Sequence, residues 1–486
     1  TQFDIKPAVE DDSAGNGGVG VANDGVIHVS LPGNHPNFGK NFGASTRTLV
    51  EDALIQADPF VDFSSFDTNA DTYIDADELS IVLIVAGYET AFAGEGTPEN
   101  NIWAHQWELS TYKSLDGVNL KPYAMFGEIH SDEASMGGTY SEQATIGVMC
   151  HELAHLLLGL PDLYDTGITP TSHGLGKWSL MAGGSWGTVT LPGDSPSYLD
   201  AWSRAVVGFA TQVEVLDPVV GDTLEPVATT DDIRVLSADK FQSPLSSEYF
   251  LLENRQQIGY DASLPAEGLL IFHLDQSISG NTNENRKQVD LEEADGLNDL
   301  DFYVLGNQGD DGDPFPGSSN NFSFTSSTTP DSNTNDAAVT DIVITGIETT
   351  LDVVTLNITP GGATLYDNDP AFTPGAGIGY LTTTGWTALE HTNTTHFDEL
   401  YGFEVYIRDN ATVIFYLYES MVSNVPTNLI ALPMGFSASL GWNRFLLATP
   451  ISFPINSTRI MVLKITNSSL PVPIWYVADG IPNETS

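Results

Sequence analysis

The chain has 486 residues, of which 41% are hydrophobic, and it carries a formal net charge of −49. This length is too great for one ordinary core, so we expect two to four domains with enough apolar residues to fold. The strong negative charge argues against binding to nucleic acid or to an anionic membrane surface. No apolar run reaches the roughly 18 residues of a membrane-spanning helix, so we expect no membrane span.

The acidic residues are concentrated in the first 360 residues, which hold 55 of the 65 Asp and Glu side chains. Such acidity suits solubility in a saline habitat, and it also offers oxygen ligands for calcium. The single cysteine, Cys150, permits no internal disulfide. Because the chain starts at Thr1 rather than at a methionine, we interpret it as a processed form of an exported protein.

The first half of the chain alternates helical and strand patterns. An amphipathic helix is predicted over residues 46–57, a buried apolar strand over 79–88 and another strand over 123–129. Thr139 and Glu142 form a capping box, which predicts a helix running to about residue 158. Together these elements predict an α+β domain over residues 1–225.

After residue 210 the pattern changes to short strands separated by frequent turns, which indicates an all-β region. We expect a β-rich domain over residues 226–360 and a Pro/Gly-rich linker over 361–377. Alternating strands beyond the linker predict a C-terminal β-sandwich over residues 366–486. The clearest predicted strands are 248–252, 268–274, 339–345, 403–407, 413–418 and 460–465.

The sequence His151-Glu152-Leu153-Ala154-His155 is the central motif of the chain. On a helix the two histidines lie one turn apart on the same face, where both imidazoles can bind one Zn²⁺ ion. Glu152 is then placed to take a proton from a water at the metal and to pass it to the leaving amine. The alternative is a charged helix face without a metal. Apolar neighbours such as Val148 and Met149 disfavour that alternative, because burying such a set unpaired is costly.

A third zinc ligand is expected shortly after this helix. Gly159 allows the chain to turn sharply and bring a carboxylate back toward the metal, and Asp162 is our choice, with Asp165 in reserve. Met181 precedes two glycines in a turn and can provide a hydrophobic floor beneath the zinc. Packing in an ordinary core is the alternative role for this methionine.

Longer segments carry a family resemblance. HELAHLLLGLPDLYD (151–165) and GLGKWSLMAGGSWG (174–187) resemble the M6, or immune inhibitor A-like, metallopeptidases. Further segments in the same order extend the resemblance over roughly residues 45–360. They are FDTNADTYIDADEL (66–79), NIWAHQW (101–107), YFLLENRQQIGYDASLPAEGLLIFHLD (249–275), VDLEEADG (289–296) and GDPFPGSSNNFSF (312–324).

The resemblance implies a secreted or cell-surface zinc endopeptidase that acts on proteins or peptides. It also implies an α+β catalytic domain of metzincin type followed by all-β domains. By match to the family motif, His151, His155 and Asp162 are the zinc ligands, Glu152 is the general base and Met181 is the Met-turn methionine.

One position departs from the metzincin spacing H-E-x-x-H-x-x-G, which would place glycine at residue 158. Here residue 158 is Leu and the glycine is Gly159, so the helix is one residue longer. This shift leaves Asp165 open as the third ligand. It also motivates an alternative function, in which a catalytically weak or inactive M6-like fold serves as an extracellular surface or structural protein.

An acidic loop follows the calcium-binding pattern of an EF-hand, although Thr72 replaces the usual glycine at position 6 and no second helix follows. We expect an isolated structural calcium site, with an acidic turn as the alternative. The expected ligands are Asp67, Asn69, Asp71, Tyr73, Asp75 and Glu78. Asp310, Asp311 and Asp313 form a second candidate calcium cluster.

The C-terminal residues 366–486 match no motif. Trp386, Trp442 and Trp475 could form a face that contacts carbohydrate or protein, with core packing as the alternative. The predicted sandwich is therefore a candidate binding or assembly module. A third hypothesis makes the whole chain a calcium-stabilised adhesion module in which Glu152 has no role.

Overall fold

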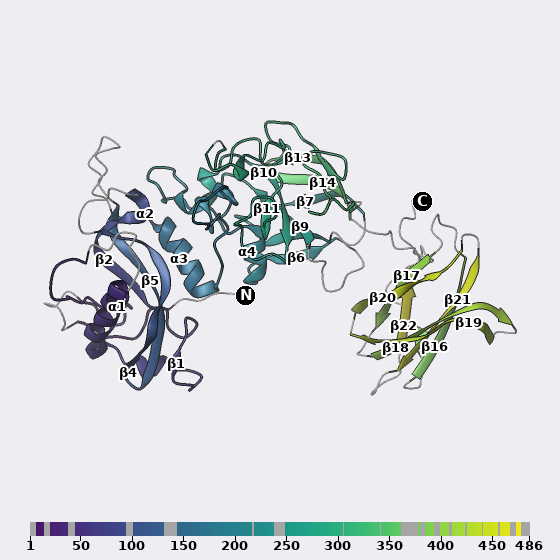
Figure 1. The fold of residues 1–486 in the computed structure, drawn as a ribbon, viewed down its shortest axis with the longest axis horizontal. Coiled ribbons are helices and arrows are strands. Elements are labelled where there is room, and N and C mark those ends of the chain that lie inside the picture. The colour runs from purple at the N-terminus through teal and green to yellow at the C-terminus, as the bar shows by residue number, and fades with distance from the viewer. Residues whose placement is uncertain are drawn as a thin grey trace.

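The fold is known from a computed structural model, shown in Figure 1, which is mostly β-sheet with few helices. The structure describes residues 6–13, 20–36, 44–93, 101–130, 143–215, 218–237, 248–304, 306–340, 342–360, 378–379, 384–392, 399–407, 411–422, 425–439, 441–454, 457–466 and 473–477.

A five-stranded mixed sheet forms the N-terminal part of the chain. β5 (Val118–His130) pairs in parallel with β1 (Tyr73–Ile74) and β2 (Val82–Glu89), and β2 pairs in parallel with β3 (Asn101–Ile102). β4 (His105–Leu115) pairs antiparallel with β5 alone among the described strands, so it is an edge strand of this sheet. The predicted strand over residues 123–129 is confirmed as part of β5.

Helix α1 (Ala44–Ala57) confirms the predicted amphipathic helix, since Val50 and Leu54 are buried against the sheet in one apolar cluster. The prediction that β2 is a fully buried strand is wrong. Residues 81, 83 and 85 pack against this cluster, but Val82 and Ile84 point away from it and are exposed. Alternate side chains of a strand point to opposite faces, and the cluster covers only one face of β2.

Helix α3 (Ile146–Leu158) carries the central motif and packs on the same sheet (Figure 1). It begins later than the capping box predicts, because Thr145 has extended backbone angles and is the N-cap residue. The Thr145 hydroxyl donates a hydrogen bond to Pro192 O at 2.6 Å, and it accepts none from the first N–H groups of the helix. Thr139 and Glu142 lie outside the described residues. The other α-helices in the described part of the chain are short: α2 (Thr90–Ala93) and α4 (Ala201–Val206).

Two further sheets follow α4, as the turn-rich pattern predicts. One has the order β11-β10-β9-β8-β6 and the other the order β12-β13-β14-β7. Strands β6 and β8 pair in parallel, and the other strand pairs described in these two sheets are antiparallel. The first consists of β6 (Thr211–Glu214), β8 (Asp232–Ser237), β9 (Glu248–Arg255), β10 (Gly268–Asp275) and β11 (Val289–Leu291). The second consists of β7 (Val219–Leu224), β12 (Ser323–Thr325), β13 (Val343–Thr350) and β14 (Val353–Thr359).

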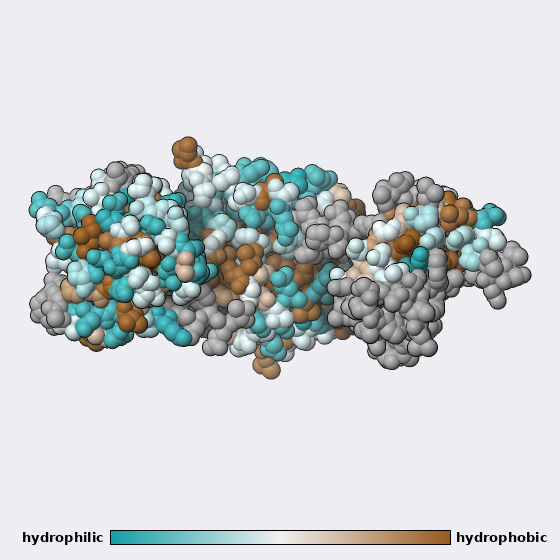
Figure 2. All heavy atoms as spheres, turned by 90° about the horizontal axis from the view of Figure 1, so that it is seen from below, coloured by the Kyte–Doolittle hydropathy of each residue, from teal (hydrophilic) through white to brown (hydrophobic). Residues whose placement is uncertain are grey.

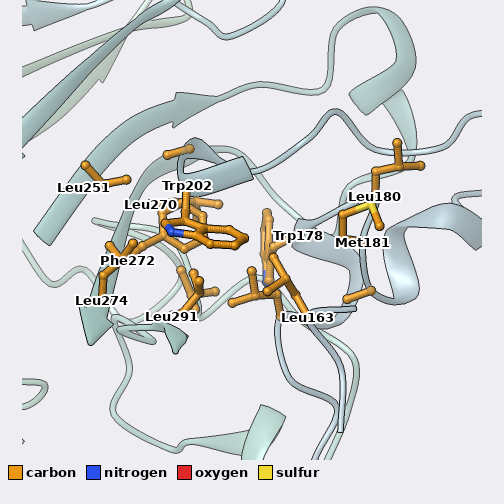
Figure 3. Close-up of a cluster of buried hydrophobic side chains, with 14 of the residues drawn as sticks. Leu163, Trp178, Leu180, Met181, Trp202, Leu251, Leu270, Phe272, Leu274 and Leu291 are labelled. Carbon is orange, nitrogen blue, oxygen red and sulfur yellow. The ribbon is translucent and has the colours of Figure 1, made fainter. Parts of the chain in front are cut away.

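One hydrophobic core joins the end of α3 and the segments after it to the sheet that contains β9 and β10. Figure 3 shows Trp178 between Met181 and Leu180 on one side and Trp202 with Phe272 on the other. These side chains come from both sides of residue 225, the boundary expected from the sequence. The segment that follows the central motif is therefore packed directly on the β-rich region.

The C-terminal strands form two four-stranded sheets with the orders β15-β22-β17-β20 and β16-β21-β18-β19. One core cluster contains residues of both sheets, including Phe445 of the first and Phe415 of the second. The strands are β15 (Ile378–Gly379), β16 (Thr384–Thr392), β17 (Glu399–Ile407), β18 (Ala411–Val422), β19 (Val425–Ala438), β20 (Gly441–Ser452), β21 (Thr458–Thr466) and β22 (Pro473–Val477). The expected linker and the side chains of Trp386, Trp442 and Trp475 lie outside the described part.

On the face seen in Figure 2, hydrophilic residues are interspersed with small groups of hydrophobic ones. None of the helices in the described part of the chain has the length and apolar character needed to span a bilayer.

Candidate metal centre

The candidate metal centre is built by the last turns of α3 and the turn that follows it. His151 and His155 lie one turn apart on the helix, which ends at Gly159 with a φ of +65°. This left-handed conformation is accessible to glycine at little cost, and the Gly159 N–H donates to His155 O at 3.1 Å. The chain then reverses direction, so that Asp162 returns to the histidines.

Three side-chain atoms meet at this turn. His151 Nε2 and His155 Nε2 are 3.1 Å apart, and Asp162 Oδ1 lies 3.1 Å from each of them. Of the described His, Cys, Asp and Glu side chains, these three form one of two groups able to share a metal ion. Burial alone would raise the pKa of the Asp162 carboxyl. Its hydrogen bonds to both histidines outweigh that effect and hold the pKa well below its usual range.

Backbone carbonyls fix the orientation of both imidazole rings. His151 Nδ1 lies 2.8 Å from Leu180 O, and His155 Nδ1 lies 2.5 Å from Leu160 O. A carbonyl oxygen can only accept a hydrogen bond, so each Nδ1 carries a proton and each ring turns its Nε2 toward Asp162. The two Nε2 atoms are thus the nitrogens that could hold a metal at this point. The sequence did not predict these two carbonyls, because every residue has one and the residue type does not show which will be used.

Asp165, the reserve candidate for the third ligand, lies outside this group. Its carboxylate accepts hydrogen bonds from the backbone N–H groups of Gly167 at 2.8 Å and Thr171 at 2.6 Å. Asp165 is buried and stabilises the loop that follows the metal centre. The structure therefore brings Asp162, and not Asp165, to the two histidines.

Glu152 links α3 to the edge strand of the N-terminal sheet. Its Oε2 accepts a hydrogen bond from the backbone N–H of Gln106 in β4 at 2.7 Å. Burial raises the pKa of the Glu152 carboxyl, while the adjacent His151 and His155 lower it. The carboxylate is thus held beside the metal centre without belonging to the group of three.

Met181 is completely buried in the core that includes Ala154 of α3 and Leu160. Its carbonyl accepts a hydrogen bond from Leu163 N at 2.8 Å, and its own N–H donates to Ser179 Oγ at 3.0 Å. The methionine therefore lies in a turn next to the end of α3, with its side chain inside the protein.

Two polar side chains near the centre were not expected from the sequence. The Tyr164 ring lies 6.3 Å from that of His151, and burial, followed by repulsion from Asp162 and Glu152, raises the pKa of its hydroxyl. Glu89 is fully buried at the end of β2, and burial raises the pKa of its carboxyl to about 7. The sequence indicated this burial only through the position of Glu89 at the end of a long apolar strand.

The predicted calcium loop has a compact conformation in which its carboxylates accept hydrogen bonds from its own backbone. Asp67 accepts hydrogen bonds from the N–H groups of Asp71 and Thr72, and Glu78 Oε1 accepts from Thr68 N at 2.9 Å. Thr72 has a φ of +69°, the left-handed conformation for which an EF-hand loop uses glycine. No three carboxylates of this loop lie close enough together to share one ion, so calcium binding stays a prediction.

The second group able to share an ion contains Glu293, Asp295 and Asp313. Only Asp313 was expected in this role; Asp310 and Asp311 are not members of the group. Burial, followed by repulsion from Asp313, raises the pKa of Glu293 to about 8, and burial raises that of Asp313 to about 7. Buried carboxyls so close together resist ionisation.

Comparison with known proteins relates part of the chain to one peptidase family. Residues 9–210, less than half of the chain, match the model of the immune inhibitor A peptidase M6 catalytic domain. This part of the chain is similar to the M6 peptidases. The M6 match includes the whole metal centre and ends at residue 210, whereas the resemblance noted from the sequence continues to residue 360.

Two relatives of the M6 domain are curated proteins. The chain is 31% identical over 189 residues to the pre-pro-metalloprotease PrtV of Vibrio cholerae serotype O1. It is 27% identical over 211 residues to immune inhibitor A of Bacillus thuringiensis subsp. alesti. The two matches cover 35% and 38% of this chain. They span only 19% and 30% of the relatives' own lengths.

Proposed function

We propose that the chain is a zinc-dependent endopeptidase in which His151, His155 and Asp162 hold the metal. The observation that carries this proposal is the triangle of donor atoms with 3.1 Å sides. Ligands at about 2.0–2.1 Å in a tetrahedron are about 3.3–3.4 Å from one another, close to the sides of this triangle. Three protein ligands leave the fourth position open, as in catalytic rather than structural zinc sites.

The chemistry of the donor set supports zinc over calcium or magnesium at this position. Two imidazole nitrogens and one carboxylate oxygen suit a borderline-soft ion, whereas calcium and magnesium take oxygen ligands almost exclusively. A zinc ion bound here supplies Lewis acidity and lowers the pKa of a water at the open position. The Met181 turn below the histidines supports a metzincin-like catalytic fold.

Glu152 is the proposed general base. It accepts a proton from the attacking water and delivers it to the amine nitrogen of the leaving group. The hydrogen bond from Gln106 N keeps the Glu152 carboxylate in place while the proton is moved. Because β4 is an edge strand next to this carboxylate, a peptide extended along β4 could reach Glu152, which supports protein or peptide substrates.

The alternative is an inactive M6-like fold with a surface or structural role, and it depends on the shift of glycine from residue 158 to Gly159. The longer helix does not separate the expected ligands, since Asp162 lies 3.1 Å from both histidines. This distance favours the peptidase over the inactive fold.

The remaining proposals concern the other parts of the chain. We propose a structural calcium ion in the loop of residues 67–78 and a β-sandwich formed by the two C-terminal sheets, which share one core. The sandwich is a candidate binding or assembly module. An extracellular location is supported by the similarity to the Vibrio relative, which is a pre-pro-metalloprotease.

The function is tested by cleavage of a quenched casein substrate by zinc-reconstituted wild-type protein and by the Glu152→Ala variant, with calcium present. We expect activity in the wild type and a loss of about 10²–10⁴-fold in the variant, with equal zinc content. If neither protein cleaves casein although both have zinc bound and are free of any propeptide, the structural alternative is favoured. Equal activity in both would exclude Glu152 as the base.

A further inference from the structure

The orientation of His151 depends on a segment that lies 25 to 30 residues further along the chain. Residues 176–181, here called the floor segment, end with Leu180 and Met181. The Leu180 carbonyl accepts the hydrogen bond from His151 Nδ1 at 2.8 Å. Any movement of the floor segment therefore moves the group that sets both the tautomer and the direction of this imidazole.

The floor segment is held by residues beyond the M6 match. Arg255 Nη1 donates to Trp178 O at 2.9 Å, and Trp178 Nε1 donates to Asp313 Oδ2 at 2.7 Å. The backbone N–H of Lys177 donates to Gln308 O at 2.7 Å. Figure 3 shows the indole of Trp178 inserted between Met181 and the side chains of the β-rich region.

Arg255 is itself fixed in a buried network of charges. Its side chain is fully buried, with Nε and Nη2 each 2.7 Å from the Asp261 carboxylate and Nη1 3.0 Å from Glu253 Oε1. Asp261 and Glu253 are also buried. A guanidinium bound bidentately inside a protein has little freedom, so the Trp178 carbonyl is tied to a rigid point.

We propose that Arg255 is a positioning residue for the metal centre, acting through Trp178 and Leu180 on the imidazole of His151. This inference rests on the proposed function, because it requires His151 to be a zinc ligand. Loss of partners that orient metal ligands typically weakens metal binding about 10–100-fold. The β-rich region after residue 210 is thus part of the catalytic unit rather than a separate attachment.

The test compares Arg255→Lys with Arg234→Lys. Lysine keeps the positive charge but cannot reach Asp261, Glu253 and the Trp178 carbonyl together. Arg234 in β8 forms an equivalent pair with Asp222, at 2.7 and 3.0 Å, without any hydrogen bond to the floor segment. The same substitution there provides a control for the general loss of a paired arginine.

Zinc affinity is measured by competition with a chromophoric chelator, and the cobalt(II)-substituted proteins are compared by visible absorption. We expect Arg255→Lys to bind zinc about 10–100-fold more weakly than wild type, with Arg234→Lys within about 3-fold of it. The cobalt absorption band should shift in Arg255→Lys only, because the ligand geometry changes there. Equal zinc affinities and spectra in the two folded variants would overturn the proposal.

A second pair of variants covers the case in which Arg255→Lys fails to fold. Asp261→Asn weakens the bidentate pair that holds Arg255, whereas Asp222→Asn makes the same change at Arg234. Weaker zinc binding in Asp261→Asn than in Asp222→Asn is expected, and equal binding would overturn the proposal. A wild type that binds no zinc would instead refute the proposed function, and this inference with it.

Discussion

Asp162 Oδ1 lies 3.1 Å from His155 Nε2, although the glycine that ends the helix comes one residue later than the metzincin spacing requires. The extra residue, Leu158, completes the last turn of α3, and Gly159 then reverses the chain with its left-handed backbone. The same carboxylate oxygen is also 3.1 Å from His151 Nε2. The inserted residue is accommodated in the helix rather than at the metal centre.

Substitution of Asp162 should therefore damage metal binding far more than substitution of Asp165. We expect Asp162→Asn to weaken zinc binding by more than ~100-fold, since losing a ligand should exceed the 10–100-fold typical of outer partners. Asp165→Asn should leave zinc affinity nearly unchanged and cost about 1–2 kcal/mol of stability, because it weakens the hydrogen bonds to Gly167 and Thr171.

Zinc affinity by chelator competition and urea unfolding of both variants separate these effects. If Asp162→Asn binds zinc more tightly than Asp165→Asn does, Asp165 and not Asp162 is the third zinc ligand.

Much of the metal centre could be predicted from the sequence, because its parts follow from helical periodicity and glycine chemistry. His151 and His155 share a helix face through their spacing of four, and Gly159 predicts the reversal that returns Asp162. The carbonyls of Leu180 and Leu160 could not be predicted, since every residue has a carbonyl and only the tertiary fold selects these two. The hydrogen bond from Gln106 N to Glu152 is of the same kind.

The misplaced elements have equally physical causes. The capping box at Thr139 and Glu142 matches a local pattern, but the helix begins at Ile146, where Thr145 bonds to Pro192 instead. The apolar run of β2 indicated burial on both faces, whereas the cluster packed against it covers only one. Local sequence specifies which residues favour an element, and the packing of distant segments decides where it starts and what covers it.

The turn at Gly159 has room for a side chain, but its left-handed backbone is strained for any residue other than glycine. A Cβ added at this position has no heavy atom within 4 Å, so strain in the left-handed backbone is the expected cost. We expect Gly159→Ala to lower the free energy of unfolding by about 1 kcal/mol. The measurement is chemical denaturation.

Gly435→Ala is the matched control, because that glycine also has open space around it but no positive φ. The control should be neutral or slightly stabilising. A Gly159→Ala variant as stable as the control would show that the turn is not conformationally strained by alanine.

The acidic loop of residues 67–78 should gain stability from calcium. The carboxylate of Glu78 accepts hydrogen bonds from the loop itself, from the N–H groups of Thr68 and Asn69 and from the Thr68 hydroxyl. Calcium at 100 times its dissociation constant would stabilise the fold by about 2.7 kcal/mol. We expect Glu78→Gln to lose most of this calcium-dependent increase in melting temperature, since the bidentate position is then uncharged.

Thermal unfolding with and without calcium is the measurement, and the exposed Glu348→Gln is the control. An unchanged calcium response in Glu78→Gln would identify the loop as an ordinary acidic turn.

The buried carboxyl of Glu293 should make the protein less stable as the pH rises. Burial and the neighbouring Asp313 raise its pKa from 4.5 to about 8, so the folded chain keeps a proton that the unfolded chain releases. This contribution to stability is fully present below about pH 4.5 and is lost as the pH rises through 8, by up to ~1.4 kcal/mol per pH unit.

Glu293→Gln should flatten the curve of unfolding free energy between pH 5 and 8, measured by denaturant unfolding in metal-free buffer. Glu348→Gln should keep the slope of the wild type, and parallel curves for wild type and Glu293→Gln would mean that Glu293 is ionised in the fold.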